Sequence, residues 1–99
     1  MGREEIDVKY TLRLYVTGQS GQSQRAVRNL ERICENDLGS NYQLEVVDVL
    51  EDPERADEDK VLATPTLIKA QPPPLRRLIG DMSDRKRVLE GLDVGAEDD

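Results

Sequence analysis

The chain has 99 residues, of which 36% are hydrophobic and 35% are charged, and its formal net charge at pH 7 is −7. A chain of this length forms one domain with a modest core, and none of its apolar runs reaches the roughly 18 residues of a membrane span. The negative charge excludes general affinity for nucleic acid or anionic lipid, because phosphate binding depends on Lys and Arg displacing counterions.

These properties predict a single soluble domain over residues 1–99, with flexible ends at about 1–8 and 94–99. The chain has one cysteine and therefore no disulfide framework, which indicates the cytoplasm. We expect it to bind neither nucleic acid nor membrane.

The first predicted element is a strand over residues 10–16, because apolar and more polar residues alternate there. A helix follows, with Ser20 or Ser23 as its cap, apolar residues at helical spacing, and Gly39 at its end. A second strand over residues 42–50 is rich in Val and Leu, which is typical of a central strand. Together the three elements predict a parallel β-α-β unit with a right-handed crossover.

In the second half of the chain, Asp52 is the expected cap of another helix, and Pro53 lies in its first turn. A strand over residues 66–70, a stiff proline turn and a partner strand over residues 75–80 follow. Ser83 is the expected cap of the last helix. The predicted element order is β-α-β-α-β-β-α.

The step Thr64-Pro65-Thr66, between a helix and a strand, is typical of thioredoxin-like folds, in which this proline is commonly cis. In those folds the proline faces a loop with a redox cysteine pair. The corresponding loop here, Thr17–Ser23, has no cysteine, and the chain has no C-x-x-C motif. A thioredoxin-type oxidoreductase is therefore the weaker alternative.

The remaining candidate sites favour binding over catalysis. Cys34 lies on the apolar face of the first helix and is predicted to be a core residue, and without histidine the usual base for a nucleophile is missing. The acids of residues 51–59 lack the spacing and central glycine of a calcium loop, so we expect no metal and no cofactor. Arg25, Arg28 and Arg32 share one helix face, where they repel one another; this favours a partner's carboxylates, and a plain solvated face is the alternative.

Several segments of the chain closely resemble the KaiB family of circadian clock proteins, over Tyr10 to Asp93 without a gap. They are Leu14-Tyr15-Val16-Thr17-Gly18, Asp48-Val49-Leu50, Pro53, Glu58-Asp59-Lys60, Leu62-Ala63-Thr64-Pro65-Thr66-Leu67, Pro72-Pro73-Pro74, Arg76-Arg77, Ile79-Gly80-Asp81 and Gly91-Leu92-Asp93. The chain departs from the family at Gly21, where a proline is expected, and in its short acidic carboxyl tail.

The resemblance implies a non-enzymatic clock component that switches between two folds. The ground-state fold, β-α-β-β-α-α-β, assembles as tetramers and is the alternative to the thioredoxin-like fold. The thioredoxin-like monomer docks on the KaiC ATPase ring, regulates its phosphorylation rhythm, captures KaiA and displaces the kinase SasA. A paralogue acting as an adaptor in stress signalling is the alternative function.

The resemblance also implies two sets of functional residues. The KaiC-facing residues are Arg25, Arg28, Lys60 and Arg77. The residues that control the fold switch are Pro65, Pro74, Gly91 and Asp93.

The last helix and the tail favour the thioredoxin-like monomer as the resting state of this chain. Residues 85–90 are good helix formers, and residues 94–99 offer little material for a strand. Gly91 weakens the helix by roughly 1 kcal/mol relative to Ala, and Asp93 opposes the helix dipole. Gly91→Ala and Asp93→Arg are therefore expected to favour the monomer further.

Overall fold

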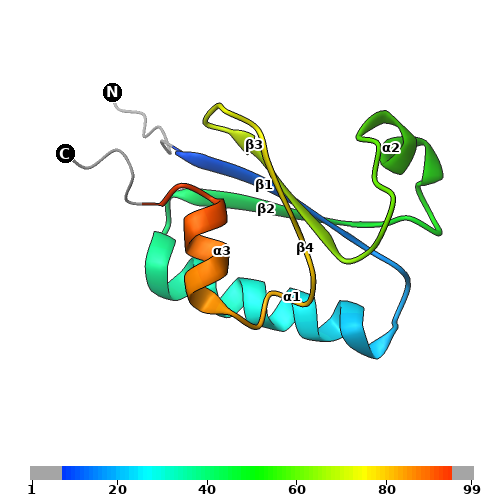
Figure 1. The fold of residues 1–99 in the computed structure, drawn as a ribbon, viewed down its shortest axis with the longest axis horizontal. Coiled ribbons are helices and arrows are strands. Elements are labelled where there is room, and N and C mark those ends of the chain that lie inside the picture. Colours follow the sequence, from blue (N-terminus) through cyan, green and yellow to red (C-terminus); the bar gives the residue numbers. More distant parts are fainter. Residues whose placement is uncertain (1–7, 95–99) are drawn as a thin grey trace, which may run out of the picture.

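A computed structural model describes residues 8–94 of the chain, which form a mixed α/β fold with the predicted element order (Figure 1). The elements are β1 (Tyr10–Val16), α1 (Gly21–Ile33), the π-helical turn η1 (Cys34–Leu38), β2 (Tyr42–Asp48), α2 (Pro53–Glu58), β3 (Thr66–Gln71), β4 (Arg76–Ile79) and α3 (Arg85–Gly91). The expected flexible ends fall mainly on residues 1–7 and 95–99, which lie outside the described residues.

The four strands form one sheet in the order β2-β1-β3-β4. β1 and β2 are parallel, as predicted, while β3 is antiparallel to both β1 and β4. In Figure 1, α1 and α3 lie together on one side of the sheet, and α2 lies apart from them at the far end of the strands. The Thr64–Pro65 peptide bond is cis, as expected for a thioredoxin-like fold, and so are Gln71–Pro72 and Pro73–Pro74.

The main core lies between the sheet and the two helices α1 and α3. Alternation in β1 directs Tyr10, Leu12, Leu14 and Val16 into this core, as the sequence predicted. A second, smaller cluster contains Tyr15, Val47 and Ile68, with Ala56 of α2 packed against it. The side of β1 that the sequence marks as more polar therefore also carries a buried residue.

The prediction that the second strand is central was wrong. Within residues 8–94, β2 is an edge strand that pairs only with β1, and Val46 within it is 44% exposed. The strand also ends at Asp48, two residues earlier than predicted, because the Asp48 carboxylate accepts the main-chain N–H groups of Gly18 and Leu50 at 3.0 and 2.9 Å. The Val-rich sequence of β2 therefore belongs to a strand that is paired along one edge, and not to a strand that is buried on both faces.

The sequence left two candidates for the cap of α1 and predicted the wrong cap for α3. Ser20 caps α1, because its hydroxyl accepts the N–H of Ser23 at 3.1 Å. The last helix is capped by Asp84 and not by Ser83: Asp84 Oδ1 accepts the N–H of Arg87, while the N–H of Ser83 donates to Asp81. The Asp84 carboxylate satisfies a free amide group in the first turn, which is the role that was expected of Ser83.

Candidate partner-binding surface

Two of the four predicted contact residues lie one turn apart on α1. Arg25 is exposed, and its Nε lies 3.9 Å from Asp81 Oδ2. Arg28 is also exposed, and it forms no ion pair with any residue in the described range 8–94. A free cation on a chain of net charge −7 is available to a partner's carboxylate.

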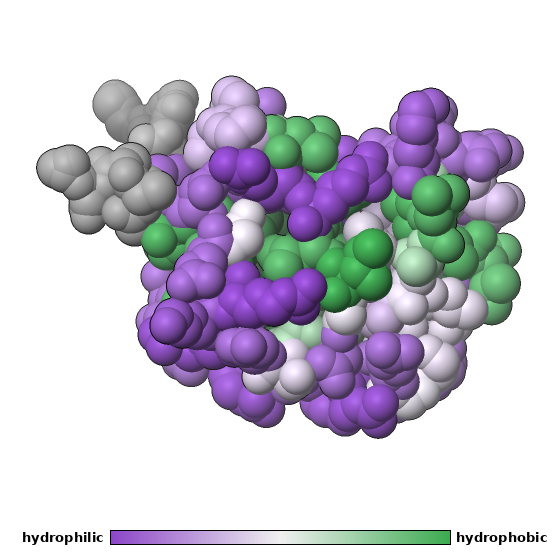
Figure 2. Space-filling model, in the orientation of Figure 1, coloured by the Kyte–Doolittle hydropathy of each residue, from purple (hydrophilic) through white to green (hydrophobic). Residues whose placement is uncertain are grey.

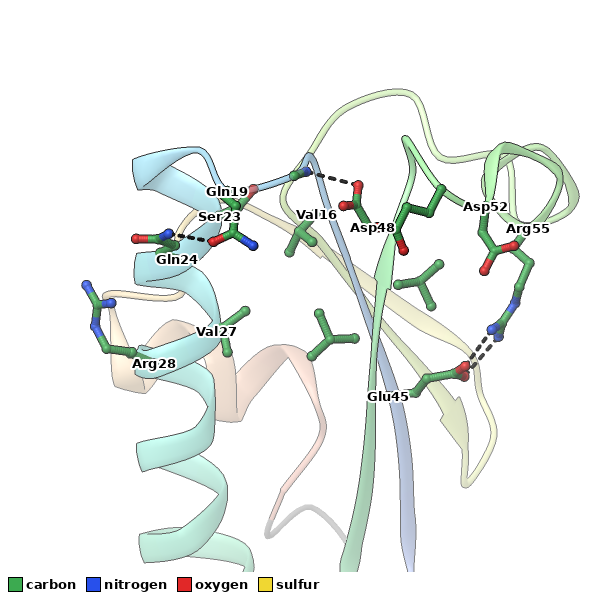
Figure 3. Close-up of a pocket in the computed structure, with 14 residues that line it drawn as sticks. Val16, Gln19, Ser23, Gln24, Val27, Arg28, Glu45, Asp48, Asp52 and Arg55 are labelled. Atoms are coloured by element: carbon green, nitrogen blue, oxygen red, sulfur yellow. Dashed lines mark hydrogen bonds and ion pairs between the residues drawn. The ribbon is translucent and has the colours of Figure 1, made fainter.

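Arg28 lies at the rim of an open groove of about 510 Å³ between α1 and the end of β2 (Figure 3). Val16 and Val27 contribute apolar surface to the groove. On the opposite side, Arg55 makes a two-pronged ion pair with Glu45, with N–O distances of 2.5 and 2.9 Å. The hydrogen bond from Arg55 lowers the pKa of Glu45, so this carboxylate stays ionised.

The other two predicted contact residues, Lys60 and Arg77, are directly linked. Lys60 follows the end of α2, is exposed, and has a left-handed backbone with φ of 54°. The Arg77 guanidinium from β4 donates to the main-chain carbonyl of Asp59 and to that of Lys60, the latter at 3.5 Å. Within residues 8–94, no hydrogen bond or ion pair joins Lys60 or Arg77 to the arginines of α1.

The carboxylate of Asp59, beside Lys60, is held by two side chains of β1. Tyr15 Oη donates to Asp59 Oδ2 at 2.5 Å, and Arg13 Nε donates to the same oxygen at 3.0 Å. Burial by itself raises the pKa of Asp59, but the hydrogen bonds from Tyr15 and Arg13 outweigh it, and the net pKa is lowered. We call Tyr15, Arg13 and Arg77, together with the Asp59 groups that they hold, the Asp59 clamp.

The Asp59 clamp was not predicted from the sequence. Tyr15 and Asp59 are 44 positions apart, so no local pattern joins them. The available signal was an aromatic residue on the side of the first strand that otherwise alternates as polar. Only the sheet topology reveals that α2 covers this side.

Exposed apolar side chains lie close to the charged ones. On the face of the molecule that Figure 1 also shows, Figure 2 has hydrophobic surface in the middle and beside α2, framed by hydrophilic residues. Leu62, in the loop after α2, is 97% exposed, and Ile79, at the end of β4, is 56% exposed. Apolar groups framed by charges are a common composition for a protein-binding surface.

Gly91 and Asp93 make contacts that the sequence could not reveal. A Cβ at Gly91 would lie 2.4 Å from Leu78 Cδ1 and 2.9 Å from Leu78 Cγ. This clash opposes the gain in helix stability that is expected from Gly91→Ala. The Asp93 carboxylate accepts from Lys69 at 3.3 Å and from Arg76 at 2.9 Å. Its charge is therefore paired, and these contacts oppose the gain expected from Asp93→Arg. The other two residues that the resemblance implies for the switch, Pro65 and Pro74, both follow cis peptide bonds.

The described residues do not assemble the groups that redox or metal chemistry needs. Cys34 is fully buried, as predicted, and burial raises its pKa to about 12. At the position of a redox loop, the hydroxyls of Thr17 and Thr64 are hydrogen-bonded to each other at 2.5 Å. Among residues 8–94, no group of three or more His, Cys, Asp or Glu could hold a metal ion, and no helix is long and apolar enough to cross a membrane.

Comparison with known proteins decides the family. The chain matches the KaiB domain over residues 13–94. The chain belongs to the KaiB family. It is 56% identical over 89 residues to the circadian clock protein KaiB3 of Synechocystis sp., and the match covers 90% of this chain and 87% of that protein. It is 55% identical over 85 residues to the circadian clock oscillator protein KaiB of Prochlorococcus marinus (strain MIT 9211), covering 86% and 75% of the two chains.

The fold of this KaiB-family chain is thioredoxin-like. It is similar to the amino-terminal domain of Synechococcus elongatus SasA, with a TM-score of 0.71, 22% identity and coverage of 93% and 90% of the two chains. It is also similar to mitochondrial thioredoxin 3 of Saccharomyces cerevisiae, with a TM-score of 0.70, 18% identity and coverage of 89% and 80%. The chain is thus a KaiB-like clock component in the thioredoxin-like fold, from a family whose named relatives are circadian clock proteins.

Proposed function

We propose that this chain docks as a thioredoxin-like monomer on the ATPase ring of a KaiC-type partner and regulates its phosphorylation rhythm. The observation that carries the proposal is that Arg28 and Lys60, two positions matching the family's KaiC-facing residues, are exposed and form no ion pair within the described residues. Arg25 and Arg77 complete the proposed contact set. Capture of KaiA and displacement of SasA follow from docking.

The likeness to the amino-terminal domain of SasA supports the displacement step. Two proteins with one fold can compete for one surface on the ring, and the match covers 93% of this chain. Competition then depends on relative affinity, and occupation by this chain lowers the fraction of ring bound to the kinase.

The proposal is tested by measuring affinity for a KaiC-type ring at low and high salt. Charges at a binding surface are screened over about 8 Å at physiological salt, so affinity is expected to fall as salt rises. Lys60→Glu is expected to weaken binding at least roughly tenfold, or about 1.4 kcal/mol, because it places a second negative charge beside the partner's carboxylates. Lys86→Glu, which reverses another exposed cation on α3, is the matched control.

Two results would contradict the proposed docking. If the affinity changes neither with salt nor with Lys60→Glu, the proposed electrostatic contact is wrong. Absence of binding to the ring in every nucleotide state would favour the adaptor role instead.

A further inference from the structure

The Asp59 clamp joins the exposed loop after α2 to the interior of the sheet. Tyr15 is fully buried, yet its hydroxyl reaches both Asp59 Oδ2 at 2.5 Å and the carbonyl of Arg55 at 3.1 Å. From β4, Arg77 reaches the carbonyls of Asp59 and Lys60. Two separate strands therefore hold one turn of main chain.

Lys60 needs such support because of its backbone conformation. A left-handed φ brings Cβ of an ordinary residue close to the following carbonyl oxygen, which costs free energy. The conformation persists where surrounding contacts determine it. Here the N–H of Lys60 donates to the carbonyl of Asp57 at 3.1 Å, and the Asp59 clamp fixes the preceding residue.

We propose that Tyr15, Arg13 and Arg77 are positioning residues for partner binding, which act by fixing Asp59 and thereby the direction in which Lys60 presents its ammonium group. The inference rests on the proposed function, in which Lys60 is a contact residue. It changes the role of Arg77, whose guanidinium donates to carbonyls of its own chain and so acts through Lys60. A loop that is already ordered loses less entropy on binding.

The first test uses the free protein and needs no partner. Tyr15→Phe removes only the hydroxyl of Tyr15, and hydrogen exchange by NMR reports on the Lys60 amide. We expect its exchange to become roughly five- to tenfold faster, about 1 kcal/mol of lost protection. Tyr42→Phe, the same change at the start of β2, is the control and is expected to leave Lys60 unchanged.

The second test measures affinity for a KaiC-type ring in four proteins: the unaltered chain, Tyr15→Phe, Lys60→Ala and the double variant. Tyr15→Phe alone is expected to weaken binding roughly fivefold, or about 1 kcal/mol. It is expected to have no further effect once Lys60 is alanine. Circular dichroism checks that each variant is folded, and Asp59→Asn replaces Tyr15→Phe if that variant is not.

A third variant separates position from charge. Arg77→Lys keeps the positive charge but loses the planar fork that reaches two carbonyls. We expect it to weaken binding about as much as Arg77→Met does, whereas Arg28→Lys is expected to preserve binding. Full affinity in Arg77→Lys would make Arg77 a simple charge contact and overturn its positioning role.

The outcomes distinguish this inference from the proposed function. If Lys60→Ala leaves ring affinity unchanged, the proposed contact is wrong and the binding role of the Asp59 clamp is overturned with it. If Lys60→Ala weakens binding but Tyr15→Phe does not, or if the two losses simply add, only the positioning inference is overturned.

Discussion

At Cys34, burial and charge act in the same direction. The thiol lies inside the core where α1 passes into η1, and burial raises its pKa to about 12, with a further contribution from Glu31, Glu35 and Asp37. A thiol with a raised pKa is protonated at neutral pH, and only the thiolate is a good nucleophile. The residue therefore serves packing.

We predict that Cys34 reacts with a thiol reagent only when the chain unfolds. The reaction is expected to be slow in buffer and fast in denaturant, measured by absorbance. Cys34→Ala is expected to lower the free energy of unfolding by about 1 kcal/mol, through lost packing, and to leave ring affinity unchanged. Rapid labelling of the folded chain, or lost binding in a well-folded variant, would contradict this.

Lys69 and Asp93 form an asymmetric pair. The Lys69 side chain is 1% exposed, whereas Asp93 is partly exposed and also accepts from Arg76. Removing Asp93 leaves a buried ammonium without its counter-charge, while removing Lys69 leaves Asp93 paired with Arg76. Breaking a buried pair on one side is the costly change, and an apolar replacement of the buried ion can be neutral.

We therefore predict that Asp93→Asn destabilises the thioredoxin-like fold more than Lys69→Met does, as measured by urea unfolding at neutral pH. The hydrogen bond from Arg76 is the main cause that lowers the pKa of Asp93 in the folded chain. The contribution of the Asp93 carboxylate to stability is thus complete above its ordinary pKa of about 4. It is lost as the pH falls through the lower pKa that Asp93 has in the folded chain. The stability difference between the unaltered chain and Asp93→Asn should shrink in that acidic range; equal losses at every pH would refute the pairing.

At the scale of elements, local patterns predicted which segments form strands and helices and that the first two strands are parallel, but not the order of the strands in the sheet. β1, β3 and the three helices were expected close to where they lie, because alternation, caps and proline are local signals. The edge position of β2 was missed, since Val-rich sequence is compatible with either place in a sheet. The Asp59 clamp was missed because it joins distant segments, and the Gly91 contact was missed because it depends on how α3 packs on β4.

The contact between α3 and β4 gives a prediction on Gly91. Gly91→Ala alone is expected to stabilise the chain by less than the roughly 1 kcal/mol of helix propensity, because the new Cβ would meet Leu78. Leu78→Ala removes Cγ and both Cδ atoms, and in that background Gly91→Ala is expected to recover the full gain. A double-mutant cycle by urea unfolding measures the difference. An equal gain in both backgrounds would show that Leu78 moves aside freely.

At the scale of the whole molecule, some acidic side chains are already paired with arginines outside the proposed contact set. Several acids are paired internally, such as Glu45 with Arg55 and Asp37 with Arg85. Arg28 and Lys60, by contrast, form no ion pair within residues 8–94. A chain of net charge −7 can therefore still present local positive charge to the acidic groups of a partner.

If the chain switches between two folds, as its family resemblance implies, we infer that α3 is the element on which the choice depends. In the thioredoxin-like fold, Val88 and Leu92 are each 1% exposed, Asp84 caps the helix, and the N–H of Val94 donates to the carbonyl of Leu89 at 3.0 Å. Burying two large apolar side chains contributes about 3–6 kcal/mol of transfer free energy before entropy is counted. These contacts act together with the paired Asp93.

We predict that the free chain rests mainly as a thioredoxin-like monomer. Residues 95–99 are Gly, Ala and three acids, which offer a competing strand little apolar or β-branched surface. Sedimentation is therefore expected to give the mass of one chain at micromolar concentration, and NMR shifts are expected to report helix over residues 85–91. Val88→Ala, which removes buried surface from α3, should shift the population toward the other fold or toward the unfolded chain. A tetramer with strand shifts after Leu89 in the unaltered protein would contradict the prediction and favour the ground-state fold.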